Sequence, residues 1–256
     1  MKQKKQCNVD ANSLTLSEHL KELKHRILII VITLLVLFFI CLFKSSSILE
    51  IVLQNGRDAG YTMVALSPQE TLMQQLRVSL VCGILLSVPV LLYEVTLFVL
   101  PALDKKIIST VYLYITFGVL LFILGMCFTI YLLFPFVLRY MSTLAHTSNI
   151  ILNISVENYI SFFLTLLLCI GFVFEIPMVS LFLSKIGLIT STTMRKRRDI
   201  VIVLTLVIAA LITPPDVVSQ IMVAIPMLVL YEISIVLCTI VEKNKIKEES
   251  DALRSE

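Results

Sequence analysis

The sequence has few charged residues, no tryptophan, and none of the motifs that identify hydrolases, kinases or metalloenzymes. Asp, Glu, Lys and Arg make up 15% of its 256 residues, against roughly 25% in ordinary soluble domains. Its three histidines have no Cys or Asp at the spacing of metal ligands, and its six cysteines form no CxxC pair. We therefore expect no enzymatic activity, no metal or cofactor site and no nucleic-acid partner.

The sequence is rich in apolar residues. Hydrophobic residues make up 58% of the chain and the mean hydropathy is +0.96, which predicts an all-α integral membrane protein. Six uncharged or nearly uncharged runs mark the predicted transmembrane helices, at residues 27–43, 78–100, 107–134, 159–184, 200–213 and 217–241. The fifth run would be about 21 Å long as a helix, short of a hydrocarbon core of about 30 Å. We expect one transmembrane domain over residues 1–241 and a charged, disordered tail over 242–256.

The positions of Lys and Arg predict the topology. Most of the 21 basic residues lie in the N-terminal tail, the second and fourth connections and the C-terminal tail, so both chain ends are expected in the cytoplasm or stroma. The two longest connections, 44–70 and 135–158, then face the opposite side. We expect them to form a cap of short structured pieces.

Glu175 is the deepest charged residue of the predicted spans. It lies at the centre of GFVFEIPMVS, inside an otherwise uncharged run from residue 158 to 184. An ionised carboxylate at mid-bilayer costs on the order of 2.5 kcal/mol or more, so such residues face a cavity, a partner or the protein interior. Glu94 and Glu232 lie near span ends, where a charge costs less. One alternative is a proton-coupled secondary transporter that uses Glu175, although no internal repeat supports it.

The segment TLSEHLKELKHR, residues 15–26, has a capping-box pattern in which Thr15 is the N-cap. Leucines then recur at helical spacing, so we predict that the first helix begins about two turns before the membrane. Two interpretations stay open for this segment. It is either an interfacial helix with solvated charges or a recognition surface on which Glu22, beside His19 and Arg26, binds a cation.

Prolines interrupt several spans. The stretch TPPDVVSQ joins the fifth and sixth runs and places Asp216 at an N-cap position, which a tight turn before a capped helix explains. Pro89, Pro177 and Pro226 lie inside spans and should kink them. Curved packing with a concave face is the expected result.

Seven stretches, read in order, resemble TatC, the core subunit of the twin-arginine (Sec-independent) protein translocase. They cover residues 16–235 and read LSEHLKELKHRIL, LSPQE, LLSVPVLLYEVTLFVLPAL, FILGMCFTIYLLFPF, YISFFLTLLLCIGFVFEIP, MRKRRDIVIV and LITPPDVVSQIMVAIPMLVLYEISI. The resemblance implies a glove-like bundle of six helices that self-associates. It also implies a receptor and scaffold that binds twin-arginine signal peptides and gathers TatA-type and TatB-type single-span subunits, so that folded proteins cross the membrane.

The resemblance also implies roles for individual residues. Glu22 matches the acid of the N-terminal helix that helps to bind the arginine pair, with His19 beside it and Lys24 where the family usually has Arg. Glu175 matches the buried polar residue of the fourth helix, on the concave side where partner helices and the signal peptide dock. Loop or structural roles are implied for Pro68, Pro177, Pro214 and Asp216.

One acid of the family pattern is missing. The family has a second arginine-binding glutamate six residues after the proline of the PAL motif, and counting from Pro101 gives Ile107. Asp104 and Glu94 are the nearest acids that could replace its charge. Glu94 itself stands where the family usually has Gln, and Thr96 where it usually has Trp, so this end of the second span is rebuilt.

The composition suggests in which membrane the protein resides. A chain without tryptophan, rich in Ile and Leu, with no recognisable signal or transit peptide, suggests a plastid-encoded member in the thylakoid membrane. A member in the bacterial plasma membrane is the alternative.

Overall fold

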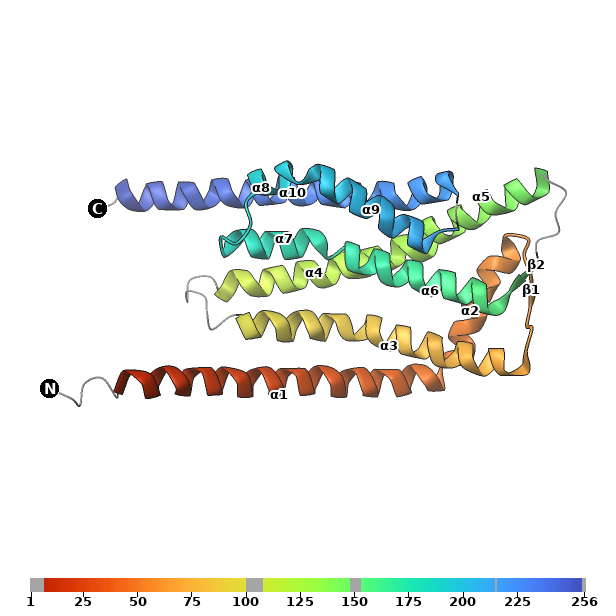
Figure 1. Ribbon diagram of the computed structural model, residues 1–256, viewed down its shortest axis with the longest axis horizontal. Helices are drawn as coiled ribbons and strands as arrows, with labels where there is room; N and C mark the ends of the chain where they lie inside the picture. Colours follow the sequence, from red (N-terminus) through yellow and green to blue (C-terminus); the bar gives the residue numbers. More distant parts are fainter. Residues whose placement is uncertain (1–6, 100–107, 148–152, 215, 255–256) are drawn as a thin grey trace.

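The computed structural model describes residues 7–99, 108–147, 153–214 and 216–254 and shows long helices that run in alternating directions along one bundle (Figure 1). Its elements are α1 (Cys7–Phe43), α2 (Ser45–Asp58), β1 (Thr62–Val64), α3 (Pro68–Val99), α4 (Ile108–Phe128), a π-helical turn (Thr129–Leu133), α5 (Phe134–Thr147), β2 (Asn153–Ser155), α6 (Val156–Val173), α7 (Ile176–Lys185), α8 (Ser191–Lys196), α9 (Arg198–Ile212) and α10 (Val217–Arg254). The all-α prediction is confirmed apart from one short pair of strands.

Five helical stretches among the described residues are long and apolar enough to cross a membrane. They are Leu20–Phe43, Gln69–Phe98, Tyr112–Leu144, Val156–Lys185 and Val217–Asn244. The predicted fifth span corresponds to α9, which has 15 residues and packs along α10. Such a helix is about 22 Å long, so the count of six spans stays a prediction.

Two helix ends differ from those expected from the sequence. Helix α1 begins at Cys7, so Thr15 lies inside the helix and is not its N-cap. Helix α10 continues to Arg254, through most of the tail that was predicted to be disordered. The reason is the same at both ends, because neither segment contains the Gly or Pro that stops a helix. The C-terminal segment is also rich in Lys and Glu, which are good helix formers.

The expected cap of short structured pieces is present at one end of the bundle (Figure 1). It contains α2, the end of α5, and a parallel pair of strands in which Thr62 of β1 lies opposite Asn153 of β2. Two buried tyrosines fix it to the helices, because the Tyr159 hydroxyl donates to the carbonyl of Val52 and the Tyr61 hydroxyl to that of Leu138. Pro68 is the first residue of α3, a position that tolerates proline.

The start of α1 and the end of α10 both lie at the other end of the bundle, on its opposite edges (Figure 1). That both chain ends share one side of the membrane, which side that is, and that the bundle is concave stay predictions.

The predicted fourth span is broken in its middle. Helix α6 ends at Val173 and α7 begins at Ile176, with Pro177 in the first turn of α7. Proline cannot donate the backbone hydrogen bond that would continue α6 through this point. The break leaves Glu175 at the junction, whereas Pro89 and Pro226 lie inside continuous helices.

Candidate functional site

Two of the carboxylates predicted for the cation site accept hydrogen bonds from the same arginine. Arg26 lies one turn after Glu22 on α1, and its Nε and Nη2 atoms donate to Glu22 Oε1 at 3.1 and 2.5 Å. Its Nη1 donates to Oε2 of Glu94, on α3, at 3.0 Å. Helices α1 and α3 pack against each other over much of their length. We call Glu22 and Glu94 the acid pair.

The acid pair is partly shielded from solvent and carries unbalanced charge. The side chains of Arg26, Glu22 and Glu94 are 18%, 35% and 10% exposed. Two carboxylates face one guanidinium, so the cluster keeps a net charge of −1 when all three groups are ionised. Ion pairs with this degree of shielding are screened less by salt than pairs on an open surface. The arrangement can therefore attract a further cation.

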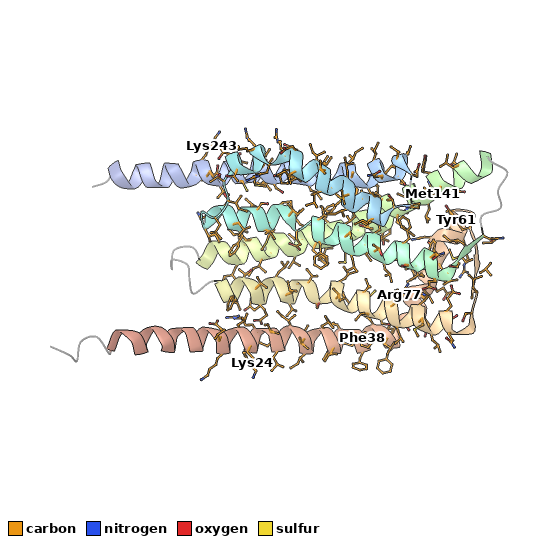
Figure 2. The ribbon with its side chains drawn as sticks, viewed as in Figure 1. Lys24, Phe38, Tyr61, Arg77, Met141 and Lys243 are labelled. Atoms are coloured by element: carbon orange, nitrogen blue, oxygen red, sulfur yellow. The ribbon has the colours of Figure 1, made fainter. Side chains whose placement is uncertain are left out.

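Of the other residues predicted for this site, the structure describes the side chain of Lys24, which is not brought to the acid pair. Lys24 is exposed, and Figure 2 shows it pointing away from the bundle. His19 belongs to α1, but its side chain lies outside the described part of the chain. Asp104 and Ile107 also lie outside the described residues.

Arg26 was named beside Glu22 in the sequence but was not predicted to belong to the site. Its spacing from Glu22 is the i,i+4 pattern in which Glu precedes Arg, which stabilises a helix and is visible in the sequence. No sequence pattern indicated its bond to Glu94, which is 68 positions away.

Glu175 lies in the break between α6 and α7 and is 5% exposed. Neither carboxyl oxygen has a hydrogen-bond partner within the described part of the chain. A β-carbon placed on Gly118 of α4 would come within 3.1 Å of Glu175 Oε2, so the helices approach closely here. A buried, unpaired carboxyl group costs free energy unless it is neutral or finds a partner.

Glu175 also lines a cavity of about 400 Å³ between α7, α8 and α10. Polar groups at the cavity come from Ser180, Thr193, Arg197 and Tyr231, and the rest of the lining is apolar. The cavity is partly open to the outside of the chain, but both carboxyl oxygens are themselves inaccessible, so a partner would reach them only after the Glu175 side chain turns toward the cavity. Glu175 thus lies inside the protein and next to a cavity, and its role in partner docking stays a prediction.

Asp216 caps α10 as predicted. Its carboxylate accepts the backbone N–H of Ser219 at 2.8 Å, which is the N-cap contact. This hydrogen bond holds the pKa of the Asp216 carboxyl below its usual range. The backbone N–H of Asp216 donates to the carbonyl of Pro214, which closes the turn before α10.

Sequence reasoning missed Glu70, which joins the start of α3 to the start of α6. Its two oxygens accept the backbone N–H groups of Leu66 and Glu157 at 2.6 and 2.7 Å. The sequence holds only a weak signal for this role, an acid in the first turn of a helix after Pro68. The bond to Glu157 depends on the tertiary structure.

Comparison with known proteins shows to which family the chain is similar. The family model described as "Sec-independent protein translocase protein (TatC)" matches residues 18–226. A TatC of Helicobacter pylori strain J99 is 36% identical over 236 residues, which cover 92% of this chain and 93% of that protein. TatCy of Bacillus subtilis is 34% identical over 226 residues, covering 88% of this chain and 89% of TatCy.

A solved structure agrees with the sequence comparisons. The crystal structure of a twin arginine translocase receptor, TatC, superimposes with a TM-score of 0.80 at 34% identity and covers 88% of this chain and 99% of that one. The chain therefore belongs to the TatC family and is a membrane component of the Sec-independent protein translocase, not an enzyme.

Proposed function

We propose that the chain is the receptor and scaffold subunit of the translocase, and that it binds the paired arginines of signal peptides at the acid pair. The observation that carries this proposal is the cluster of Glu22, Arg26 and Glu94, with two carboxylates on two helices and one guanidinium between them. The similar solved structure is that of a twin arginine translocase receptor, which supports the same role here.

The chemistry of the acid pair suits an arginine-rich ligand. A guanidinium makes short, charge-assisted hydrogen bonds to carboxylates and can address two oxygens at once. The bonds of Arg26 engage one oxygen of each acid, so the second oxygens can receive a ligand. In this proposal Glu94 supplies the charge that the family has at the position of Ile107, and Asp104 is a further acid for the second arginine.

Glu175 is proposed to dock a single-span partner. Its carboxyl group is buried, unpaired within the described residues and next to a partly open cavity. A polar side chain on a TatA-type helix would satisfy it by hydrogen bonding. Docking of TatB-type subunits and self-association belong to the same scaffold role. No observation favours the proton-coupled transporter.

The relatives compared here are bacterial. They support a multi-pass protein of the bacterial plasma membrane, which was the alternative home. The composition of the chain remains the sole argument for a plastid thylakoid membrane.

Site-specific crosslinking tests the receptor role. A photoreactive residue at position 23, next to Glu22, should crosslink to a twin-arginine precursor, and an excess of unlabelled signal peptide should abolish the product. The matched control is position 35, which is also exposed on α1 but lies in the apolar part of the span. Equal crosslinking at both positions, or a product insensitive to competitor, would contradict the proposal.

A further inference from the structure

The cavity beside Glu175 is also lined by a residue of opposite charge. Among the described residues that line it, Glu175 and Arg197 are the two that carry charge. Glu175 lies in the break between α6 and α7, and Arg197 lies between α8 and α9. We propose that Arg197 is the counter-ion of Glu175 when no partner is bound, and that a partner must displace Arg197 to reach the carboxyl group. The second half of this inference rests on the proposed docking at Glu175.

The hydrogen bonds at the cavity leave Glu175 and Arg197 for each other. Neither oxygen of Glu175 has a partner among the described residues. No hydrogen bond or ion pair holds the Arg197 guanidinium within the described part of the chain. Each of the three hydroxyl groups that line the cavity is already bonded to a backbone carbonyl or to another hydroxyl, namely those of Ser180, Thr193 and Tyr231. The donors with free capacity at this cavity are therefore the N–H groups of Arg197.

Two acids of α10 that could hold Arg197 have other partners. Glu232 forms an ion pair with Arg198, the residue after Arg197, at 2.5 Å. Glu242 accepts the backbone N–H of Ser191 at the start of α8, at 2.6 Å. Glu175 is then the acid at the cavity that remains for Arg197.

Arg197 is placed so that its side chain can extend into the cavity. The Met194 carbonyl accepts both the Tyr231 hydroxyl and the backbone N–H of Arg197, at 2.9 and 3.1 Å. Because Tyr231 itself lines the cavity, these bonds hold the base of the Arg197 side chain next to it. The side chain is exposed and the cavity is partly open. The Glu175 oxygens are inaccessible, so the carboxyl group must turn toward the cavity to meet the guanidinium.

Pairing would offset a cost that the fold has already imposed on Glu175. A carboxylate that is 5% exposed and has no donor is unfavourable. A guanidinium can donate to both carboxylate oxygens at once, and it is more weakly hydrated than an ammonium group. Arg197 therefore gains two bonds for a small loss of its own hydration. A partner helix that offers hydrogen bonds to Glu175 competes with Arg197 for the same two oxygens.

A double-mutant cycle tests the pair. Glu175→Gln and Arg197→Gln are made singly and together in the full chain, and the unfolding equilibrium constant is measured by SDS titration in detergent micelles. If the two side chains interact, their effects should be non-additive by about fivefold or more in that constant. Lys196→Gln is the matched control, because it removes the same charge from the exposed neighbouring residue, which does not line the cavity. Its effect should add to that of Glu175→Gln.

Charge reversal keeps the pair testable where a Gln variant does not fold. Glu175→Arg places two cations at the cavity and should destabilise the chain. Adding Arg197→Glu should restore part of the lost stability, whereas adding Lys196→Glu should not. Additive effects in the cycle, or equal rescue by the two reversals, would overturn the pair.

Crosslinking to a TatA-type helix tests the displacement. A photoreactive residue at position 179, which is exposed and lines the cavity, reports docking. In Arg197→Gln the yield should rise about threefold or more, because the competing paired state is removed, and Lys196→Gln should keep the wild-type yield. An unchanged or lower yield in Arg197→Gln would overturn the displacement. Absence of the crosslink from every variant would contradict the proposed docking at Glu175, which the unfolding data on the pair do not depend on.

Discussion

At the residue scale, the acids of the chain differ in what balances their charge. Glu22 and Glu94 share Arg26, and Asp216 accepts backbone N–H groups at a helix start. Glu175 has no hydrogen-bond partner within the described residues, although it is more deeply buried than Glu94. The acids with partners keep their charge without a large free-energy cost. Glu175 has no such partner within the described residues, so its charged form is costly until a partner binds.

Glu94 should be the second carboxylate of the receptor site. Glu94→Gln removes a charge-assisted contact worth roughly 1.5 to 3 kcal/mol, so affinity for a twin-arginine peptide should fall about tenfold or more. Ile107→Glu in the same chain should restore part of the loss, because the family has its acid there. Titration with labelled peptide measures both effects, with Glu157→Gln as the control. Wild-type affinity in Glu94→Gln would point to Asp104.

Glu175 should serve partner contacts and not proton transfer. Glu175→Gln keeps hydrogen-bonding capacity but cannot titrate, and Glu175→Ala removes both properties. We expect the Gln variant to retain much of the transport activity. The Ala variant should lose crosslinks to TatA-type helices near this position while it still binds precursor. Equal inactivity of both variants with intact partner crosslinks would support a proton carrier instead.

At the element scale, the packing of α1 on α3 decides whether the acid pair exists. Glycine at position 83 of α3 allows the close approach, because a β-carbon there would lie 3.1 Å from the backbone nitrogen and Cα of Phe38. Backbone atoms cannot move aside as a flexible side chain can. The distance between the two helices thus depends on Gly83, about three turns from Glu94.

Gly83→Leu should force α1 and α3 apart. Overpacking of this kind costs typically about 1 to 3 kcal/mol, and it should also weaken signal-peptide binding by separating Glu22 from Glu94. Thermal unfolding and peptide titration report the two effects. Leu86→Phe is the control, since Leu86 is exposed on the same helix and its enlargement should leave both measurements unchanged. Normal peptide affinity in a destabilised Gly83→Leu would separate the packing from the site.

The cap on α10 should give a pH-dependent contribution to stability. Because the pKa of Asp216 is lower in the folded protein, its charge stabilises the fold above the ordinary Asp pKa of about 3.9. That contribution is lost as the pH falls through the folded-state value. Asp216→Asn should therefore be less stable than the wild type at pH 7, and the difference should vanish at acidic pH. A difference that persists at acidic pH would contradict this explanation.

At the scale of the whole molecule, the two ends of the bundle differ in the residues and contacts that they carry. The end with the start of α1 and the end of α10 carries the acid pair and most of the basic residues that the structure describes. The opposite end carries the cap, which buried hydrogen bonds and the β1–β2 pair hold to the helices. The proposed binding site and the structural cap thus lie at opposite ends of the bundle (Figure 1).

Tyr159→Phe tests how firmly the cap is held. The change leaves the buried carbonyl of Val52 without its donor, which should cost about 1 to 3 kcal/mol. Limited proteolysis within residues 44–70 should become faster, while the affinity for signal peptide should stay at the wild-type value. Proteolysis at the wild-type rate would show that other contacts hold the cap.

The sequence by itself determined the apolar runs, the acid at Glu175 and the capped turn at Asp216, because each depends on local composition or on residues a few positions apart. It did not locate the helix ends at Cys7 and Arg254, since the absence of Gly and Pro marks no boundary. Only the tertiary structure decided that Arg26 joins Glu22 to Glu94 and that Glu175 lies unpaired beside a cavity. Those contacts depend on how α1 meets α3 and on what faces the break between α6 and α7, and hydrophobic periodicity does not encode either.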